Sequence, residues 1–310
     1  MTLYNIVAST SEATVVAECP PSPYRADSYQ SEADLEREFI AQLERQGYEY
    51  IQFHNESALV NNLRVQLEAL NHISFTDAEW QRFFGEKIAN AREGITEKTR
   101  KIQDDYIQIL KRDDGTESNV YLLDKRAIHN NRLQVLNQYE APDGLHPSRY
   151  DVTILVNGFP MVHVELKRRG VALREAFNQI NRYGRESFWS GSGLFEYVQI
   201  FVISNGTNTK YYSNTTRKKH LDDQKPGSIP SGKKGSHSFE FTNYWADISN
   251  RPIFDLVDFT STFFAKHTLL NILTRYCVFN AQDELLVMRP YQIAATDRKS
   301  TRLNSSHVSQ

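Results

Sequence analysis

Three ionisable residues lie close together in a stretch that has the pattern of a β-hairpin. The stretch "RYDVTILVNGFPMVHVELKRRG" spans residues 149–170, with Asp151 opening its first apolar strand and Glu165 and Lys167 in its second. Because side chains alternate along a strand, Glu165 and Lys167 share one face of the second strand with His163. Two acids and a lysine on one polar face either pair with one another or hold a metal ion for chemistry.

The length of the turn decides whether Asp151 can join that face. A two-residue Asn157-Gly158 loop would set Asp151 and Glu165 on opposite faces of the hairpin, because a shift of one residue inverts every side chain. A three-residue loop, with Gly158 or its neighbour in a left-handed conformation, would bring both acids to the same face. We therefore expect a loop of three or five residues, or a β-bulge near Asp151. A plain two-residue turn would argue against a site.

The chemistry of this set of groups fits phosphodiester hydrolysis. Two carboxylates suit Mg²⁺, which takes oxygen ligands and keeps several waters. Such an ion clamps a phosphate oxygen and lowers the pKa of a bound water. Lys167 could orient that water or stabilise the charge of the transition state. The alternative is an exposed ion pair between Glu165 and Lys167, which is worth roughly 0–1 kcal/mol and is common.

A helix expected at about 171–186 follows the hairpin and carries further polar groups. Gln179 and Tyr183 are spaced i, i+4 and therefore lie on one helical face. Arg182 and other arginines lie nearby. Amide, phenol and guanidinium groups can all contact phosphate or base edges. The same pattern also describes an ordinary amphipathic helix, so the helix alone does not decide the function.

The remaining pattern indicates an α/β fold, with a mixed sheet flanked by helices. Two antiparallel strands at 151–156 and 161–167 are followed by a helix and a strand at 198–204, which predicts a right-handed crossover between parallel strands. Further helices are expected between Ser31 and Gly47 and at 57–70, 76–89 and 254–275. Further strands are expected at 48–53, 105–110, 119–124, 132–140 and 209–214.

Composition narrows the class of protein. The chain has 310 residues, 40% hydrophobic content and a net charge of −2, so it is not a uniformly basic nucleic-acid protein. Local charge is uneven, however, with net +4 over 165–185 and net +5 over 210–237. A DNA backbone would favour such basic segments, although solvated surfaces would explain them as well. Two distant cysteines, no signal peptide and no membrane-length apolar run predict a cytoplasmic protein.

The order of these motifs resembles a known family of nucleases. Asp151, the triplet Glu165-Leu166-Lys167 and the segment 179–183 resemble the PD-(D/E)xK pattern with its Q-x-x-x-Y extension. That extension is typical of RecB-like nucleases and of type I restriction enzyme endonuclease (R, or HsdR) subunits. The stretches "RYDVTILVNG", "VELKRRGVALREAFNQINRY" and "LLVMRPYQIAAT" look specifically like the R subunits, and the resemblance covers most of residues 25–296. It implies a restriction-endonuclease-like core.

The resemblance also implies roles for individual residues. Asp151 and Glu165 would bind Mg²⁺ and act in catalysis together with Lys167. Gln179, Tyr183 and Arg182 would bind DNA or assist its engagement. An accessory acid could come from Glu32 or Glu36 in the first helix, although exposed helix charges are the simpler explanation. Tyr150 departs from the pattern, because the name of the motif places a proline there.

The same resemblance divides the chain into four parts. They are an irregular arm at 1–24, the endonuclease domain at 25–253, a helical linker and motor entry at 254–296, and an unrelated tail at 297–310. Gln292 would read adenine in a motor, but no phosphate loop is present, so ATP is expected only with a motor-containing protein.

The implied activity is that of a bacterial or archaeal type I site-specific deoxyribonuclease. Its expected partners are double-stranded DNA and the methylation (M) and specificity (S) subunits, with no membrane. Two alternatives remain at this point. One is a catalytically silent fragment that binds DNA or a subunit, and the other is a stand-alone nuclease of the Mrr or RecB-like kind.

Overall fold

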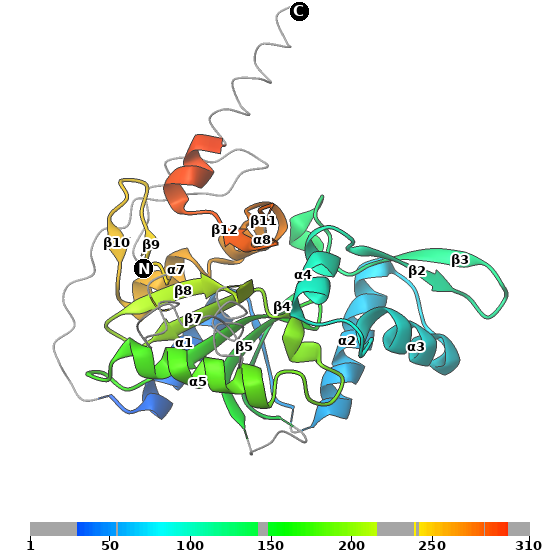
Figure 1. Cartoon of the computed structure of the whole chain (residues 1–310), viewed down its shortest axis with the longest axis horizontal. Helices are drawn as coiled ribbons and strands as arrows, with labels where there is room; N and C mark the ends of the chain where they lie inside the picture. Colours follow the sequence, from blue (N-terminus) through cyan, green and yellow to red (C-terminus); the bar gives the residue numbers. More distant parts are fainter. Residues whose placement is uncertain are drawn as a thin grey trace, which may run out of the picture.

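A six-stranded mixed sheet flanked by helices forms the centre of the protein (Figure 1). The structure is a computed structural model that describes residues 30–53, 55–141, 148–215, 239, 242–281 and 283–296. Neighbouring strands follow the order β1-β4-β5-β6-β7-β8, which confirms the expected α/β class. The strands are β1 (Glu49–Ile51), β4 (Leu133–Glu140), β5 (Arg149–Val156), β6 (Phe159–Leu166), β7 (Ile200–Ser204) and β8 (Thr209–Ser213).

The central strands are connected as the sequence predicts. Strands β5 and β6 pair antiparallel, and β6 then pairs parallel with β7 across the helix α5 (Leu173–Glu186). Every residue of β6 and of β7 is buried, as expected for strands covered on both faces. The crossover places α5 beside the carboxyl end of β6, where the polar triplet lies.

Helices α1 to α4 and a separate β-hairpin precede the central hairpin in the chain. Helix α1 begins at Ser31, whose side chain accepts a hydrogen bond from the backbone N–H of Asp34. The hairpin of β2 and β3 forms its own two-stranded sheet instead of joining the central one. These elements are α1 (Glu32–Arg45), α2 (Glu56–Asn71), α3 (Asp77–Phe83), the π-helical η1 (Phe84–Ile88), α4 (Ile95–Gln103), β2 (Ile107–Lys111), β3 (Glu117–Tyr121) and the 3₁₀ turn η2 (Ile128–Asn130).

The predicted long helix at 254–275 is wrong, because two helices occupy this stretch. Helix α7 (Leu256–Thr262) ends before Phe263, and α8 (Lys266–Arg275) begins after Ala265. Phe263 and the next residue, Phe264, are both fully buried, and their rings lie 5.2 Å apart. Consecutive residues point about 100° apart on one continuous helix, so the break lets both rings reach the core.

Smaller elements complete the described part of the chain. They are η3 (Leu194–Tyr197), β9 (Trp245–Ala246), β10 (Pro252–Ile253), β11 (Cys277–Phe279), β12 (Leu285–Val287) and a helix at 290–296. Among the described helices, none combines the length and the apolarity that crossing a membrane would require. The arm predicted at 1–24 and the tail predicted at 297–310 lie outside the described residues.

The turn between β5 and β6 has two residues, so the expectation of a three- or five-residue loop is wrong. Asn157 and Gly158 have φ angles of 49° and 84°, and Val156 pairs directly with Phe159. Positive φ at both central residues is the geometry of a type I′ turn, which Asn-Gly favours. The Asn157 side chain supports this turn by donating to the Asn131 side-chain oxygen at 2.7 Å.

A β-bulge close to the turn restores the register that a two-residue loop would otherwise lose. Leu155 pairs with Pro160, but Ile154 pairs with Val162, so Met161 is an additional residue in β6. Proline has no backbone N–H, and a proline in a central strand is found at such bulges. From this point the register sets Thr153 opposite His163. The predicted bulge therefore exists, but it lies at the turn and not near Asp151.

Replacing Gly158 by alanine should destabilise the protein more than the same change at Gly115. Both glycines have a similar positive φ, 84° and 86°. A Cβ at Gly158 would lie 2.7 Å from the Leu63 Cα in α2, whereas nothing lies within 4 Å at Gly115. We expect G115A to cost roughly 1–2 kcal/mol from the left-handed backbone alone. G158A should cost about 1–3 kcal/mol more through the added overlap.

Urea denaturation of the two variants measures the difference. Equal losses of unfolding free energy would show that the turn does not pack tightly against α2.

Candidate active site

The three residues of the predicted constellation converge at the carboxyl end of β6. The Lys167 Nζ lies 2.9 Å from the Glu165 Oε1 and 3.0 Å from the Leu166 carbonyl oxygen. The Asp151 Oδ2 accepts a hydrogen bond of 2.9 Å from the Leu166 backbone N–H. The Asp151 side chain thus accepts a hydrogen bond from a backbone N–H of β6 at the point where the pairing of β5 with β6 ends. The bulge makes this meeting of Asp151 and Glu165 possible.

Burial strongly affects the protonation of the two acids. The Glu165 side chain is fully buried, and its Oε2 accepts no hydrogen bond within the described residues. Burial, followed by repulsion from Glu165, raises the pKa of Asp151 to about 8. Burial likewise raises the pKa of Glu165 to about 7, although the Lys167 ammonium opposes the rise. Burial disfavours the charge of Lys167, but the Glu165, Asp151 and Glu32 carboxylates together more than offset this and raise the lysine pKa.

The two acids proposed from α1 have different surroundings. The Glu32 carboxylate lies near the cluster, since it accepts a 3.3 Å hydrogen bond from the Arg168 backbone N–H and raises the pKa of Glu165. The Glu36 carboxylate instead accepts hydrogen bonds from the side chains of Asn137 and Gln138 in β4. Of the two, Glu32 therefore has the better position for an accessory acid.

Glu36 supports an unusual backbone conformation in the neighbouring strand. Gln138 has a φ of 51°, and it stands opposite Asp151, because Asn137 pairs with Val152 and Tyr139 pairs with Tyr150. A non-glycine residue in the left-handed region costs roughly 1–2 kcal/mol. The hydrogen bonds from α1 hold this strained residue in place beside the candidate site.

The helix α5 places Gln179 and Tyr183 against the start of β5. The Gln179 side-chain amide donates to the Tyr183 hydroxyl, which in turn donates to the Arg149 carbonyl oxygen at 2.8 Å. Tyr183 is only 2% exposed, and burial, with Glu165 as a second cause, raises its pKa. Arg182 is exposed and lies over the Tyr183 ring at 5.7 Å. Tyr183 thus anchors the strand that carries Asp151, whereas Arg182 faces solvent.

A group of aromatic rings that no sequence motif indicated lies behind the carboxylates. Tyr150, which stands where the motif has proline, is 1% exposed and donates from its hydroxyl to the Ser187 Oγ at 2.8 Å. Its ring lies 5.6 Å from the His163 ring and 4.9 Å from the Tyr183 ring. The signal that could have revealed this group is the polar histidine two residues before Glu165, within an apolar strand.

The oxygen ligands of the cluster fit an open site for a hard divalent cation. They do not form a site in which protein side chains enclose the metal ion. Among the described residues, no group of three or more His, Cys, Asp or Glu side chains is placed to enclose a metal ion. Mg²⁺ does not require such a group, because it usually keeps several waters and one or two carboxylates. The fully buried Glu165 oxygen without a hydrogen bond is an unmet acceptor at the right place. Asp151 and Glu165 are therefore the residues that could hold the ion.

The remaining candidate, Gln292, lies apart from this cluster in the chain. It is exposed in the helix at 290–296, and its Oε1 accepts a 2.8 Å hydrogen bond from the Arg289 backbone N–H. This is a local contact at the start of a helix. Its predicted role in binding a nucleotide stays a prediction.

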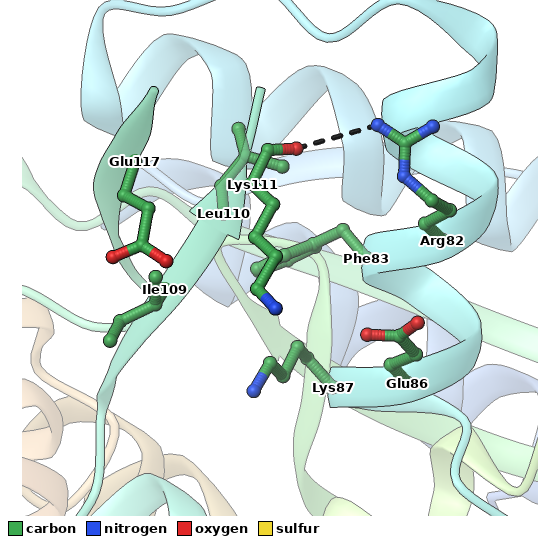
Figure 2. Close-up of a pocket in the computed structure, with 8 residues that line it drawn as sticks. All are labelled: Arg82, Phe83, Glu86, Lys87, Ile109, Leu110, Lys111 and Glu117. Carbon is green, nitrogen blue, oxygen red and sulfur yellow. Dashed lines mark hydrogen bonds between the residues drawn. The ribbon is translucent and has the colours of Figure 1, made fainter. Parts of the chain in front are cut away.

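A surface hollow of about 180 Å³ shares no residue with the carboxylate cluster (Figure 2). It lies between the α3–η1 segment and the β2–β3 hairpin, where Arg82 donates to the Lys111 carbonyl oxygen at 3.4 Å. Its lining mixes basic and acidic side chains without a buried polar group. The lining residues are Arg82, Phe83, Glu86, Lys87, Ile109, Leu110, Lys111 and Glu117. It offers no arrangement for phosphodiester chemistry.

The sequence matches a known protein family and several curated relatives. A family model described as "Type I restriction enzyme R protein N terminus" matches residues 29–220. The chain is 52% identical over 285 residues to the "Type I restriction enzyme EcoprrI endonuclease subunit" of Escherichia coli, which covers 92% of this chain and 86% of that relative.

Longer relatives occur in staphylococci. The chain is 40% identical over 275 residues to the "Type I restriction enzyme SsaAORF53P endonuclease subunit" of Staphylococcus saprophyticus, covering 87% of this chain. It is 37% identical over 276 residues to the "Type I restriction enzyme SauCOLORF180P endonuclease subunit" of Staphylococcus aureus, covering the same share. It spans 27% of the length of each of these two relatives.

Neutralising Asp151 should stabilise the protein when no divalent cation is present. A carboxyl whose pKa rises on folding destabilises the fold above its ordinary pKa near 4, and this cost is complete only above the folded pKa, about 8 for Asp151. Asn keeps an oxygen that can accept from the Leu166 N–H. In EDTA at pH 8.5, we expect the unfolding free energy of D151N to exceed that of wild type by about 1–3 kcal/mol. The gain should fade towards pH 4.

Thermal unfolding across this pH range measures the gain. The matched control is E117Q, the same kind of change at an exposed strand position. A D151N melting temperature at or below that of wild type at pH 8.5 would contradict the electrostatic account.

Removing the Tyr183 hydroxyl should weaken the fold, because the Arg149 carbonyl then loses its donor. We expect Y183F to cost about 1 kcal/mol and the exposed control R182A to cost less than about 0.5 kcal/mol. Urea denaturation provides the measurement. Equal stability of Y183F and wild type would show that the hydroxyl does not anchor β5.

Proposed function

This chain belongs to the family of type I restriction enzyme R protein N termini, and we propose that it is the Mg²⁺-dependent endonuclease domain of such an enzyme. In this proposal it hydrolyses phosphodiester bonds of double-stranded DNA. The observation that carries the proposal is the meeting of Asp151, Glu165 and Lys167 at one end of the central hairpin. The names of the relatives, which are endonuclease subunits, support the same activity.

The charge of the cluster supports a divalent cation. Glu165 is buried, and Asp151 is largely enclosed beside it, with Glu32 nearby. Within the described residues, Lys167 is the lysine or arginine within hydrogen-bonding distance of Glu165. Buried charges are normally paired or bound to metals, since their desolvation is costly. When bound, Mg²⁺ would polarise a phosphate oxygen and activate a water for attack. Asp151 and Glu165 would supply its protein oxygens.

Lys167 is placed to act on the phosphate. Its ammonium has three N–H groups, and two of them are used by the Glu165 Oε1 and the Leu166 carbonyl. The remaining N–H can donate to a phosphate oxygen and stabilise the negative charge that develops during the reaction. The two protein contacts fix the ammonium in place, so no further ordering is needed when the substrate binds.

Exposed arginines around the cluster would bind the DNA backbone. Arg149 precedes Asp151, Arg168 follows Lys167, and Arg182 lies on α5, and all three are exposed. Phosphate contacts of this kind position a duplex without reading its sequence. Sequence recognition would therefore come from elsewhere.

The activity would take place within a larger assembly. Because the staphylococcal relatives are nearly four times as long as the matched region, we propose that this domain works with a motor that uses ATP. The word "subunit" in the names of the relatives fits the further proposal that M and S subunits are partners. In that arrangement, residues 254–296 would lead from the nuclease towards the motor.

The test is cleavage of a plasmid by an R subunit that contains this sequence and its motor region, assembled with M and S subunits. We expect K167A and D151N each to lower the rate by about 10²-fold or more. The control K111A changes an exposed lysine outside the cluster and should cut like wild type.

Two results would contradict the proposal. Undiminished cleavage by K167A would remove the nuclease assignment of this cluster. Full cleavage in EDTA would remove the metal from it.

A further inference from the structure

His163 lies directly behind the candidate metal ligand Glu165. It is two residues earlier in β6, on the same face, and it is completely buried. The His163 Nε2 lies 3.5 Å from the Glu165 Oε2, and the His163 Nδ1 lies 3.3 Å from the Thr153 Oγ1. Each ring nitrogen thus has a polar group beside it, and one of these groups is the carboxylate of the site.

Aromatic rings fix the orientation of the imidazole. They lie edge to face with it, at interplanar angles of 74–79° and centroid distances of 5.6–6.3 Å. They come from β5, from α5 and the segment after it, and from β7, so the imidazole is enclosed from several sides. The four rings are Tyr150, Tyr183, Phe188 and Phe201. Such packing leaves little freedom for the imidazole to turn away from Glu165.

The contact with Glu165 indicates the tautomer, because an ionised carboxylate can only accept a hydrogen bond. The Thr153 hydroxyl can donate to Nδ1, which leaves the proton of a neutral imidazole on Nε2, facing Glu165. At 3.5 Å this N–H is an electrostatic contact, and it lies slightly beyond the usual hydrogen-bond length. A small rotation of the Glu165 carboxylate would shorten it.

We propose that His163 is a positioning residue that sets the orientation of the Glu165 carboxylate for metal binding. Lys167 holds the Glu165 Oε1, and His163 directs its N–H at Oε2, so both oxygens are oriented. A carboxylate oxygen has two lone pairs, so the contact with His163 leaves one for a cation. Groups of this kind, which orient a ligand from behind, typically change metal affinity 10- to 100-fold when they are removed.

This inference rests on the proposed function. Measurements of metal affinity test the role of His163 and the proposed function separately. Mn²⁺ and Mg²⁺ are titrated into the full chain by calorimetry. We expect H163F, which fills the aromatic space without a donor, to bind each ion about 10-fold or more weakly, and H163Q, which keeps an N–H, to stay within about 3-fold of wild type. The control F259L alters a buried ring of α7, outside the four rings around His163, and should lose stability but keep its metal affinity.

The outcomes separate the two proposals. Loss of metal binding in D151N, with unchanged affinity in H163F, would overturn the role of His163 and leave the proposed function intact. Affinity in H163Q as weak as in H163F would also overturn it, because the donor would then not matter. Absence of metal binding in wild type would count against the proposed function itself.

A second measurement does not depend on how the variants fold. Long-range ¹H–¹⁵N correlation spectra of the wild-type chain report the tautomer of His163. We expect the proton on Nε2. A proton on Nδ1 alone would leave no donor facing Glu165 and would overturn the inference, whatever the metal titrations show.

Discussion

Burial of charge at one end of β5 and β6 is the constraint on which the other features of the site depend. Glu165 is fully buried, and Asp151 is largely enclosed beside it. An ionised carboxylate in such a place needs donors, since the protein has taken away its water. The Leu166 N–H and the Lys167 ammonium supply part of this need. The part of the desolvation cost that these donors do not offset opposes folding. A divalent cation would relieve this cost.

The register between the two strands shows how far sequence reasoning reached. Alternation along β5 and β6 placed the polar groups, and the requirement for one extra residue between the acids was correct. The error was its location, because we expected it in the loop or in a bulge near Asp151, whereas it is a bulge at Met161 beside the turn. The Asn157-Gly158 pair already favours a two-residue turn. Pro160 was the available signal, because a proline within a central strand points to a bulge at that position.

Contacts between distant residues explain what local pattern could not predict. Helix α4 was missed, since Lys98 and Lys101 interrupt its apolar stripe and yet are buried. The Lys98 Nζ lies 2.9 Å from the Glu196 Oε2, a partner almost a hundred residues away. The contrast between Glu32 and Glu36 has the same origin. Both fit one helix equally well, and only the strand beneath them shows that Glu36 is held by Asn137 and Gln138.

The tyrosine at position 150 shows that one physical requirement can be met in two ways. A proline there would restrict the backbone before Asp151 through its own ring, without any partner. In this chain the Tyr150 hydroxyl is tied to Ser187, and its ring packs on His163 and Tyr183. The Tyr183 hydroxyl in turn binds the carbonyl of Arg149. The strand start is thus held by packing against α5, so the precision of the carboxylate cluster depends on that helix as well as on the hairpin.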